Sequence, residues 1–432
     1  MAATCCALVD SVAYIDTTNG STNHSTAQTF SSTGNQIVVS LWPAHPPIPS
    51  RLSVHLKKRM QHPGQDFLQE PKILCAADGF FVLRTAIGRG PPPNNITQRM
   101  SDYFVYQPAS STGGGPSLRL LAHPHPHLFG DGEVGVLPRG SGHHFTIAVL
   151  SQTSYYKFVL YLFKSEDWCW TSKKVLVDSP RLPFPMPLPP DHVHGHFQHL
   201  TNSVITIGGS RGTIGWVDLW HEILLYDVLR DSNDDDDKIR LVPLPVRPGS
   251  HCGKALDCCP KPYRSIAVVG DCLKLVELEP FGDRLPGKDP ETGGPKLRID
   301  EWTLTTYSTK CNITGNPPED WKIDFTVNAS AVRIDTTMQS ALVRCGMLRN
   351  SDEAAERKLQ YLWTCQPVIS LNDDEGTVVY LITRVKFRHP KAWLLALDMA
   401  NNQVLAMAMI ETERSTALSL NYVPCRISSP AT

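Results

Sequence analysis

The feature that most constrains the fold is a series of short apolar segments, gathered in groups of three or four and separated by turn-rich stretches. A new group begins roughly every fifty to seventy residues. Some of these segments, such as FVLYLF, are apolar on both sides, as are strands covered on both faces. Charged residues make up only 19% of the chain, and 35 prolines and 29 glycines interrupt it. This pattern favours many short strands joined by turns over long charged helices.

We therefore predict an all-β fold, a β-propeller-like array of antiparallel blades of three to four strands, with six blades as the best count. A pair of β-sandwiches or a long jelly roll are the alternatives. A single helix is predicted as an insertion over residues 350–363, because Asn350 is a candidate N-cap with Glu353 three residues on. The Asn-Asn-Gln stretch at 401–403 is typical of a hairpin turn.

The chain divides into few parts. We predict a disordered N-terminus at 1–7, a single propeller-like domain at 8–425 and a C-terminal tail at 426–432. Within the domain, residues 180–199 are rich in proline and histidine, which predicts an extended connection on the surface.

Charge and composition exclude several classes of function. The chain has 41 Lys and Arg against 42 Asp and Glu, a formal net charge of −1, so no basic excess indicates nucleic acid or a membrane surface. No run of 18 apolar residues and no secretory signal is present, and we expect the twelve cysteines to be reduced. The expectation is a monomer in the cytoplasm, the nucleus or both, with protein partners and no cofactor.

A serine motif raises the possibility of an enzyme. Gly208–Gly212 reads GGSRG and fits G-x-S-x-G, the pattern of a nucleophile elbow, in which a helix follows the serine. The next residues, GTIGWVDLWHEILLYDVL at 212–229, have helical apolar spacing but are rich in glycine, β-branched and aromatic residues. We predict two strands with a turn at His221–Glu222, and Ser210 in a surface loop.

A histidine-rich stretch is the best candidate for a metal site. His192, His194 and His196 alternate in DHVHGHFQHL, so on an extended segment they would lie on one face and share an ion. The stretch lacks HExxH spacing, and no C-x-x-C pair supports a zinc knuckle, so a solvated loop is the simpler interpretation.

The segment from 212 onward also carries a family resemblance. GTIGWVDLWHEILLYDVL, followed by IRLVPLP, is similar to the signature of proteins with domain of unknown function 1618, a family expanded in cereal grasses. PKILCAADGFFVLRTAIG and WPAHPPIPSRLSVH resemble its N-terminal half, so the resemblance spans roughly residues 8–425. The signature residues in this chain are Gly212, Gly215, Trp216, Asp218, Trp220 and Asp227.

The resemblance implies no assigned activity and no catalytic residues. The architecture of the family resembles the propeller-like associated domains of plant F-box proteins, whose recurring strands have counterparts here at Asp78–Gly79, Tyr106–Pro108 and Arg240–Pro245. Gln107 stands where those domains usually have asparagine, and no F-box segment precedes residue 40. A link to a ubiquitin ligase therefore requires another subunit.

These observations predict a scaffold or adaptor that binds proteins through loops on a propeller. Asp234, Asp235, Asp236 and Asp237 are the candidates for its binding face. The alternative is a metal-dependent or serine hydrolase that uses the histidine-rich stretch or Ser210, and a third possibility is a diverged copy with little activity. The long loops expected to determine specificity lie around 90–97, 110–116, 231–238 and 282–295.

Overall fold

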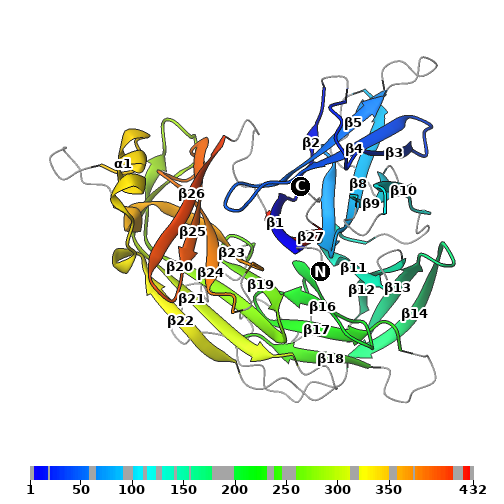
Figure 1. Ribbon diagram of the computed structural model, residues 1–432. Helices are drawn as coiled ribbons and strands as arrows, with labels where there is room; N and C mark the ends of the chain where they lie inside the picture. Colours follow the sequence, from blue (N-terminus) through cyan, green and yellow to red (C-terminus); the bar gives the residue numbers. More distant parts are fainter. Residues whose placement is uncertain are drawn as a thin grey trace.

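The computed structural model confirms an all-β chain of mostly antiparallel sheets with one α-helix in the described residues (Figure 1). It describes residues 4–17, 20–57, 65–90, 101–109, 114–122, 129–140, 144–154, 157–177, 199–230, 238–245, 259–311, 321–349, 358–372, 375–411 and 422–428. Within these ranges no helix is long and apolar enough to cross a membrane.

The first half of the chain forms three groups of strands in sequence order. The first sheet contains β2 (Tyr14–Ile15), β3 (Ala27–Phe30), β4 (Gln36–Trp42) and β5 (Arg51–Lys57). The second contains β6 (Gln65–Phe67), β7 (Lys72–Ala77), β8 (Phe80–Arg89), β9 (Ser101–Gln107) and β10 (Ser117–Leu120). The third group contains β11 (Val134–Arg139), β12 (His144–Ser154), β13 (Lys157–Lys164) and β14 (Cys169–Val177).

The second half repeats this arrangement. The fourth group contains β15 (Ser203–Gly208), β16 (Thr213–Asp218), β17 (Glu222–Asp227) and β18 (Lys238–Pro243). The fifth sheet contains β19 (Arg264–Val269), β20 (Cys272–Lys288), β21 (Pro295–Lys310) and β22 (Lys322–Asn328). The sixth contains β23 (Trp363–Ile369), β24 (Val378–Arg384), β25 (Lys391–Asp398) and β26 (Gln403–Glu411). A short parallel pairing of β14 with β18 joins the third and fourth groups into one eight-stranded sheet.

One strand from each of five successive groups, here called its leading strand, contacts the leading strand of the next group. β7 contacts β11, β11 contacts β15, β15 contacts β19, and β19 contacts β23. The two ends of the chain complete this order. β1 (Thr4–Asp10) and β27 (Tyr422–Ser428) form an antiparallel pair, and β27 contacts both β23 and β7. In Figure 1 the groups follow one another in colour order, and both chain ends lie near the middle.

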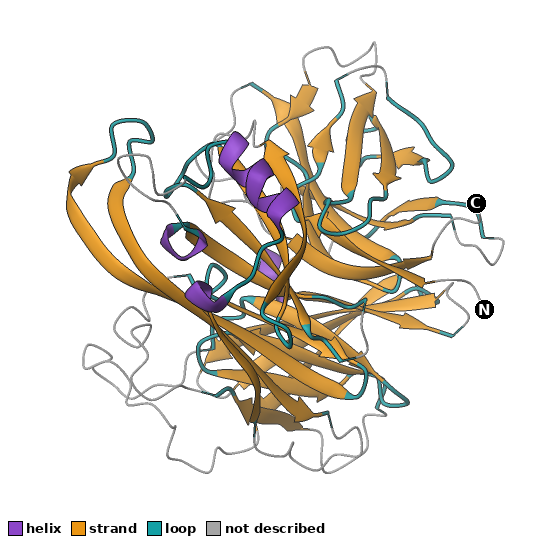
Figure 2. Cartoon of the chain, turned by 60° about the vertical axis from the view of Figure 1, so that its left-hand side comes forward, coloured by secondary structure: helices purple, strands orange, loops and turns teal. Residues whose placement is uncertain are grey.

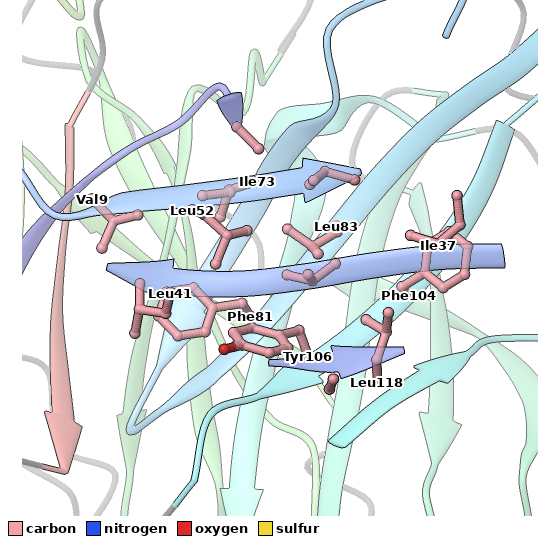
Figure 3. Close-up of a cluster of buried hydrophobic side chains, with 14 of the residues drawn as sticks. Val9, Ile37, Leu41, Leu52, Ile73, Phe81, Leu83, Phe104, Tyr106 and Leu118 are labelled. Atoms are coloured by element: carbon pink, nitrogen blue, oxygen red, sulfur yellow. The ribbon is translucent and has the colours of Figure 1, made fainter. Parts of the chain in front are cut away.

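Neighbouring groups are held together by buried apolar side chains from both partners. Figure 3 shows the cluster between the first and second sheets, where Ile37 and Leu52 face Phe81 and Phe104, with Val9 of β1 at its side. Similar clusters join the second group to the third, the third to the fourth, the fourth to the fifth and the fifth to the sixth. Burial on both faces of β16 and β17 follows from this packing and explains the apolar runs in the sequence.

The two ends of the chain are ordered, because they pair with each other. We predicted disorder at 1–7 and a tail from 426, but residues 4–7 and 426–428 lie in β1 and β27. Their backbone groups are paired along the whole register from Thr4–Ser428 to Asp10–Tyr422, which offsets the entropy of ordering the chain ends.

The α-helix in the described residues lies before the predicted range, and the described end of that range is not α-helical. The α-helix, α1, spans Thr336–Arg344 (Figure 2). Asp335 Oδ1 accepts a hydrogen bond from the Met338 backbone N–H at 2.7 Å, and Leu342 packs into the core between the fifth and sixth sheets. Of the predicted range 350–363, the first eight residues lie outside the description. The rest forms one turn of 3₁₀ helix and the start of β23, because pairing with β24 outweighs the local helical pattern.

The predicted loop at 282–295 is also wrong. β20 and β21 continue through most of this range as a long hairpin, so only its tip is a turn. Lys386 Nζ, between β24 and β25, lies 2.9 Å from Asp289 Oδ1 and 2.7 Å from Glu291 Oε2. The hairpin is thus attached to the sixth sheet, and the fifth and sixth groups are linked by polar as well as apolar contacts.

Candidate functional site

The G-x-S-x-G segment is a hairpin, as predicted. Ser210 is exposed in the turn between β15 and β16, and a strand rather than a helix follows it. β16 then pairs with β17 in register from Thr213–Asp227 to Asp218–Glu222. The turn between β16 and β17, predicted at His221–Glu222, ends one residue earlier than expected, because Glu222 already belongs to β17. The strand–turn–helix geometry of a nucleophile elbow is absent from this described segment.

The signature residues at the middle of this hairpin have packing roles. Trp216 is 0% exposed, and its Nε1 donates a hydrogen bond to the Glu133 carbonyl at 2.8 Å. A Cβ on Gly215 would lie 2.9 Å from the Ile205 side chain, so any larger residue there would require its neighbours to shift. Gly212 has φ +63°, and a Cβ there would lie 2.6 Å from Leu137.

The signature residue Asp227 closes one end of the hairpin. Its Oδ1 accepts hydrogen bonds from Thr213 Oγ1 at 2.6 Å and from Arg240 Nη2 at 2.9 Å, and Arg211 Nη1 lies 3.7 Å from its Oδ2. These contacts join β16, β17 and β18 through one buried carboxylate. Arg240 therefore has a structural partner in Asp227.

The opposite end holds a buried cluster of ionisable side chains. Asp218 and Glu222 are directly paired across the turn, with side chains 2% and 3% exposed. His199, 1% exposed, lies just before β15, and its Nδ1 is 2.8 Å from Glu222 Oε1. His221 Nδ1 is 3.1 Å from Asp218 Oδ2. Two carboxylates and two imidazoles thus meet at one point of the fold, which we call the His199 cluster.

The local chain geometry holds this cluster in place. Asp218 Oδ1 accepts the Trp220 backbone N–H at 3.0 Å, and Oδ2 accepts that of Leu200 at 3.2 Å. His199 is fixed from the third group, since its backbone N–H donates to Gln152 Oε1 at 3.0 Å and its ring packs edge-on against Phe158. The His199 cluster therefore lies at the boundary between the third and fourth groups.

Protonation in the cluster follows from these contacts. Burial alone would raise the pKa of Asp218, but the hydrogen bond and charge of His221 outweigh it and hold that pKa below its usual value. Burial acts to lower the pKa of His221, but its contacts with Asp218 outweigh that effect and raise it. Asp218 and His221 therefore form an ion pair.

The next group approaches the cluster through Arg264, which is 2% exposed. Its guanidinium pairs with Glu277 at 2.7 Å, donates to the Leu219 carbonyl at 3.1 Å and lies 5.2 Å from the centre of the Trp220 ring. The signature residue Trp220 thus provides a cation–π contact between the fourth and fifth groups.

Chemically, the His199 cluster offers ligands for a metal ion or sites for proton exchange. One candidate ligand atom from each of His199, Asp218 and Glu222 lies within 4.8 Å of the other two. Imidazole nitrogen and carboxylate oxygen are both common zinc ligands.

Two sets of predicted site residues lie outside the described residues. These are Asp234 to Asp237 and the histidines His192, His194 and His196. The neighbouring His199 belongs to the predicted surface connection at 180–199, yet it is buried. The sequence instead predicts a solvated stretch around His199 and a turn at Glu222. The useful signal was the Asp-x-x-His-Glu spacing at 218–222, which places two carboxylates opposite each other if the segment is a hairpin.

The fold and the site define an all-β chain of successive antiparallel sheets with a buried histidine–carboxylate cluster at one sheet boundary. Residues 216–380 match the family model described as protein of unknown function (DUF1618). The match runs from Trp216 in β16 to Tyr380 in β24, so it includes Asp218, Glu222 and Asp227 but not His199. It supports the presence of that domain of unknown function. No curated protein matches the chain.

Proposed function

We propose that the chain forms a six-bladed β-propeller that acts as a protein-interaction module, as a scaffold or adaptor. The closed order of contacts among β7, β11, β15, β19, β23 and β27 carries this proposal. Five groups each supply one leading strand, and β27 supplies the sixth next to β1 and the first sheet. Such a ring is a rigid platform whose strand connections gather at its two ends, where binding residues usually lie.

The exposed apolar side chains favour a binding role. Ile15, Phe30, Trp42 and Ile48 all belong to the first sheet or its loops and are 39% to 57% exposed. Apolar residues that gather on one region of a surface often mark an interaction site. On the same sheet, the Arg51 guanidinium lies 5.1 Å from the centre of the Tyr14 ring.

The acidic run between β17 and β18 suggests the chemistry of the partner. Residues 231–237 read DSNDDDD, so five carboxylates lie within seven residues. We propose that Asp234 to Asp237 contact a partner surface rich in Lys and Arg, because complementary charge gives specificity and speeds encounter. The proposal includes a monomeric protein of the cytoplasm or nucleus, without nucleic acid or membrane as partner. It also includes a relationship to the F-box-associated domains of plants.

The test is quantitative affinity purification with three forms of the full chain. We would compare the wild type, a variant with Asp234 to Asp237 replaced by Ser, and a control with the same change in charge. The control replaces four exposed acids on other parts of the surface, namely Glu70, Asp167, Asp283 and Glu375.

We expect a set of basic partners that binds the wild type and the control but not the Asp234-to-Asp237 variant, with capture falling as salt rises. Equal melting temperatures of the three forms would show that the loss is not caused by unfolding. The same partners on all three forms would contradict the proposed face. Labelling of Ser210 by a fluorophosphonate probe would contradict the interaction module in favour of a serine hydrolase.

A further inference from the structure

We propose that His199, Asp218 and Glu222 bind one divalent transition-metal ion, with zinc as the metal that best fits the ligands. This site is distinct from the row at His192, His194 and His196 in the sequence. It is independent of the proposed interaction role, because it concerns the boundary between the third and fourth groups rather than the partner-binding face.

The geometry fits zinc after small side-chain movements. Zinc bonds to imidazole nitrogen and carboxylate oxygen are about 2.0–2.2 Å long, so ligand atoms of a tetrahedral site lie about 3.4 Å apart. The three ligand atoms here are within 4.8 Å of one another, and His199 Nδ1 and Glu222 Oε1 are 2.8 Å apart. The ion would replace the proton between His199 Nδ1 and Glu222 Oε1 and slightly lengthen the distance between these two atoms. It would also draw the Asp218 carboxylate toward itself.

The charge of the cluster favours an added cation. Two carboxylates are almost completely buried, and a buried carboxylate is costly unless a cation compensates it. His221 pairs with Asp218. The other carboxylate, Glu222, has the imidazole of His199 as its partner. The other nitrogen of that histidine, Nε2 of His199, is buried and has no hydrogen-bond partner within the described ranges. A divalent ion would compensate the charge of the second carboxylate, and with Nδ1 bound to the ion the neutral imidazole would carry its proton on Nε2.

The surrounding contacts orient the ligands as outer partners do in metal sites. Asp218 is held by the backbone N–H groups of Leu200 and Trp220 and by the ring of His221, which is 30% exposed. With three protein ligands, the fourth position would hold water or His221. Because the ligands come from the segment before β15 and from the β16–β17 hairpin, the ion would fix the entry of the fourth group against the third.

The test measures metal binding by the full-length protein after dialysis against EDTA. Calorimetric titration should show one zinc ion per chain and a higher melting temperature with zinc than with EDTA. Cobalt should give the visible absorption of a tetrahedral site without thiolate ligands. Glu222→Gln and Asp218→Asn should each lose most of the affinity, whereas replacement of His192, His194 and His196 by Ser should leave the stoichiometry and the absorption unchanged.

Two results would overturn the proposal. The first is a wild-type chain that binds no zinc after dialysis. The second is a Glu222→Gln variant that keeps the ion while the serine variant loses it, which would move the site to the histidine-rich row. X-ray absorption of the zinc-loaded wild type removes any dependence on the folding of variants. It should show nitrogen and oxygen ligands including one or two imidazoles, and sulfur ligands would assign the ion to cysteines and refute the site.

Discussion

Removal of the Trp216 side chain tests whether the hairpin at 213–227 is the buried centre of the fourth group. The indole is 0% exposed, packs with side chains of the third and fourth groups and donates a hydrogen bond to the Glu133 carbonyl. Truncation of a buried tryptophan to alanine costs about 3–5 kcal/mol. The carbonyl left without its donor adds about 1 kcal/mol or more. We therefore expect Trp216→Ala to lower the free energy of unfolding by about 4–6 kcal/mol.

A second substitution separates packing from hydrogen bonding. Trp216→Phe keeps most of the apolar contact but removes the Nε1 donor, so we expect a loss of about 2 kcal/mol. The matched control is Trp42→Ala, because Trp42 is 39% exposed and its Nε1 bonds only the Ser53 hydroxyl among the described contacts. That control should change the free energy of unfolding by less than about 1 kcal/mol.

The assay is equilibrium unfolding in urea, followed by circular dichroism and by fluorescence so that coincident transitions confirm a two-state analysis. A whole domain has only about 5–15 kcal/mol of stability, so the Trp216→Ala variant should be close to unfolding in water. A loss below about 1 kcal/mol for Trp216→Ala, equal to that of Trp42→Ala, would refute the burial of this hairpin.

Three further predictions follow from single contacts. Gly215→Ala should cost about 1–3 kcal/mol in urea unfolding, because its Cβ would lie 2.9–3.0 Å from three side chains; no loss would show a looser core. Arg264→Met should cost about 3 kcal/mol or more, because it leaves Glu277 charged and buried, and an unchanged urea midpoint would contradict that pair. The hydrogen bond from Lys386 lowers the pKa of Asp289 to about 2. The stability contributed by this contact is therefore complete above pH 3.8, and it disappears as the pH falls through about 2. Lys386→Met should return this pKa toward 3.8 in an NMR titration, and a value that stays near 2 would contradict the contact.

Much of the fold could be predicted because strands and turns leave local patterns. The turn expected at 401–403 joins β25 to β26, with Asn402 at φ +52°. Other elements were misread where a local pattern competed with tertiary packing. At the end of the helical pattern predicted over 350–363, for example, Trp363 begins β23, which pairs with β24.

The candidate site could not be predicted because its members meet only through tertiary structure. Nothing in the local sequence distinguishes His199 from His192 to His196. Its burial depends on Gln152 and Phe158, which belong to another group of strands. Asp218 and Glu222 are four residues apart, a spacing that also suits a helix face, and only the turn of the hairpin places them opposite each other.

In the proposed propeller, the two chain ends close the ring of sheets. The register places Ala7 of β1 opposite Cys425 of β27, and both side chains are buried. Directly opposed residues in antiparallel strands have Cα atoms about 4.5–5.5 Å apart, within the range that a disulfide can bridge.

The most direct measurement is therefore oxidation of the Ala7→Cys variant, followed by peptide mapping under non-reducing conditions. We expect a disulfide between the introduced cysteine and Cys425, a higher melting temperature, and neither effect when Cys425→Ser is added. Failure to form this bond in the folded variant, or a bond to a cysteine of another strand, would contradict the closure of the ring.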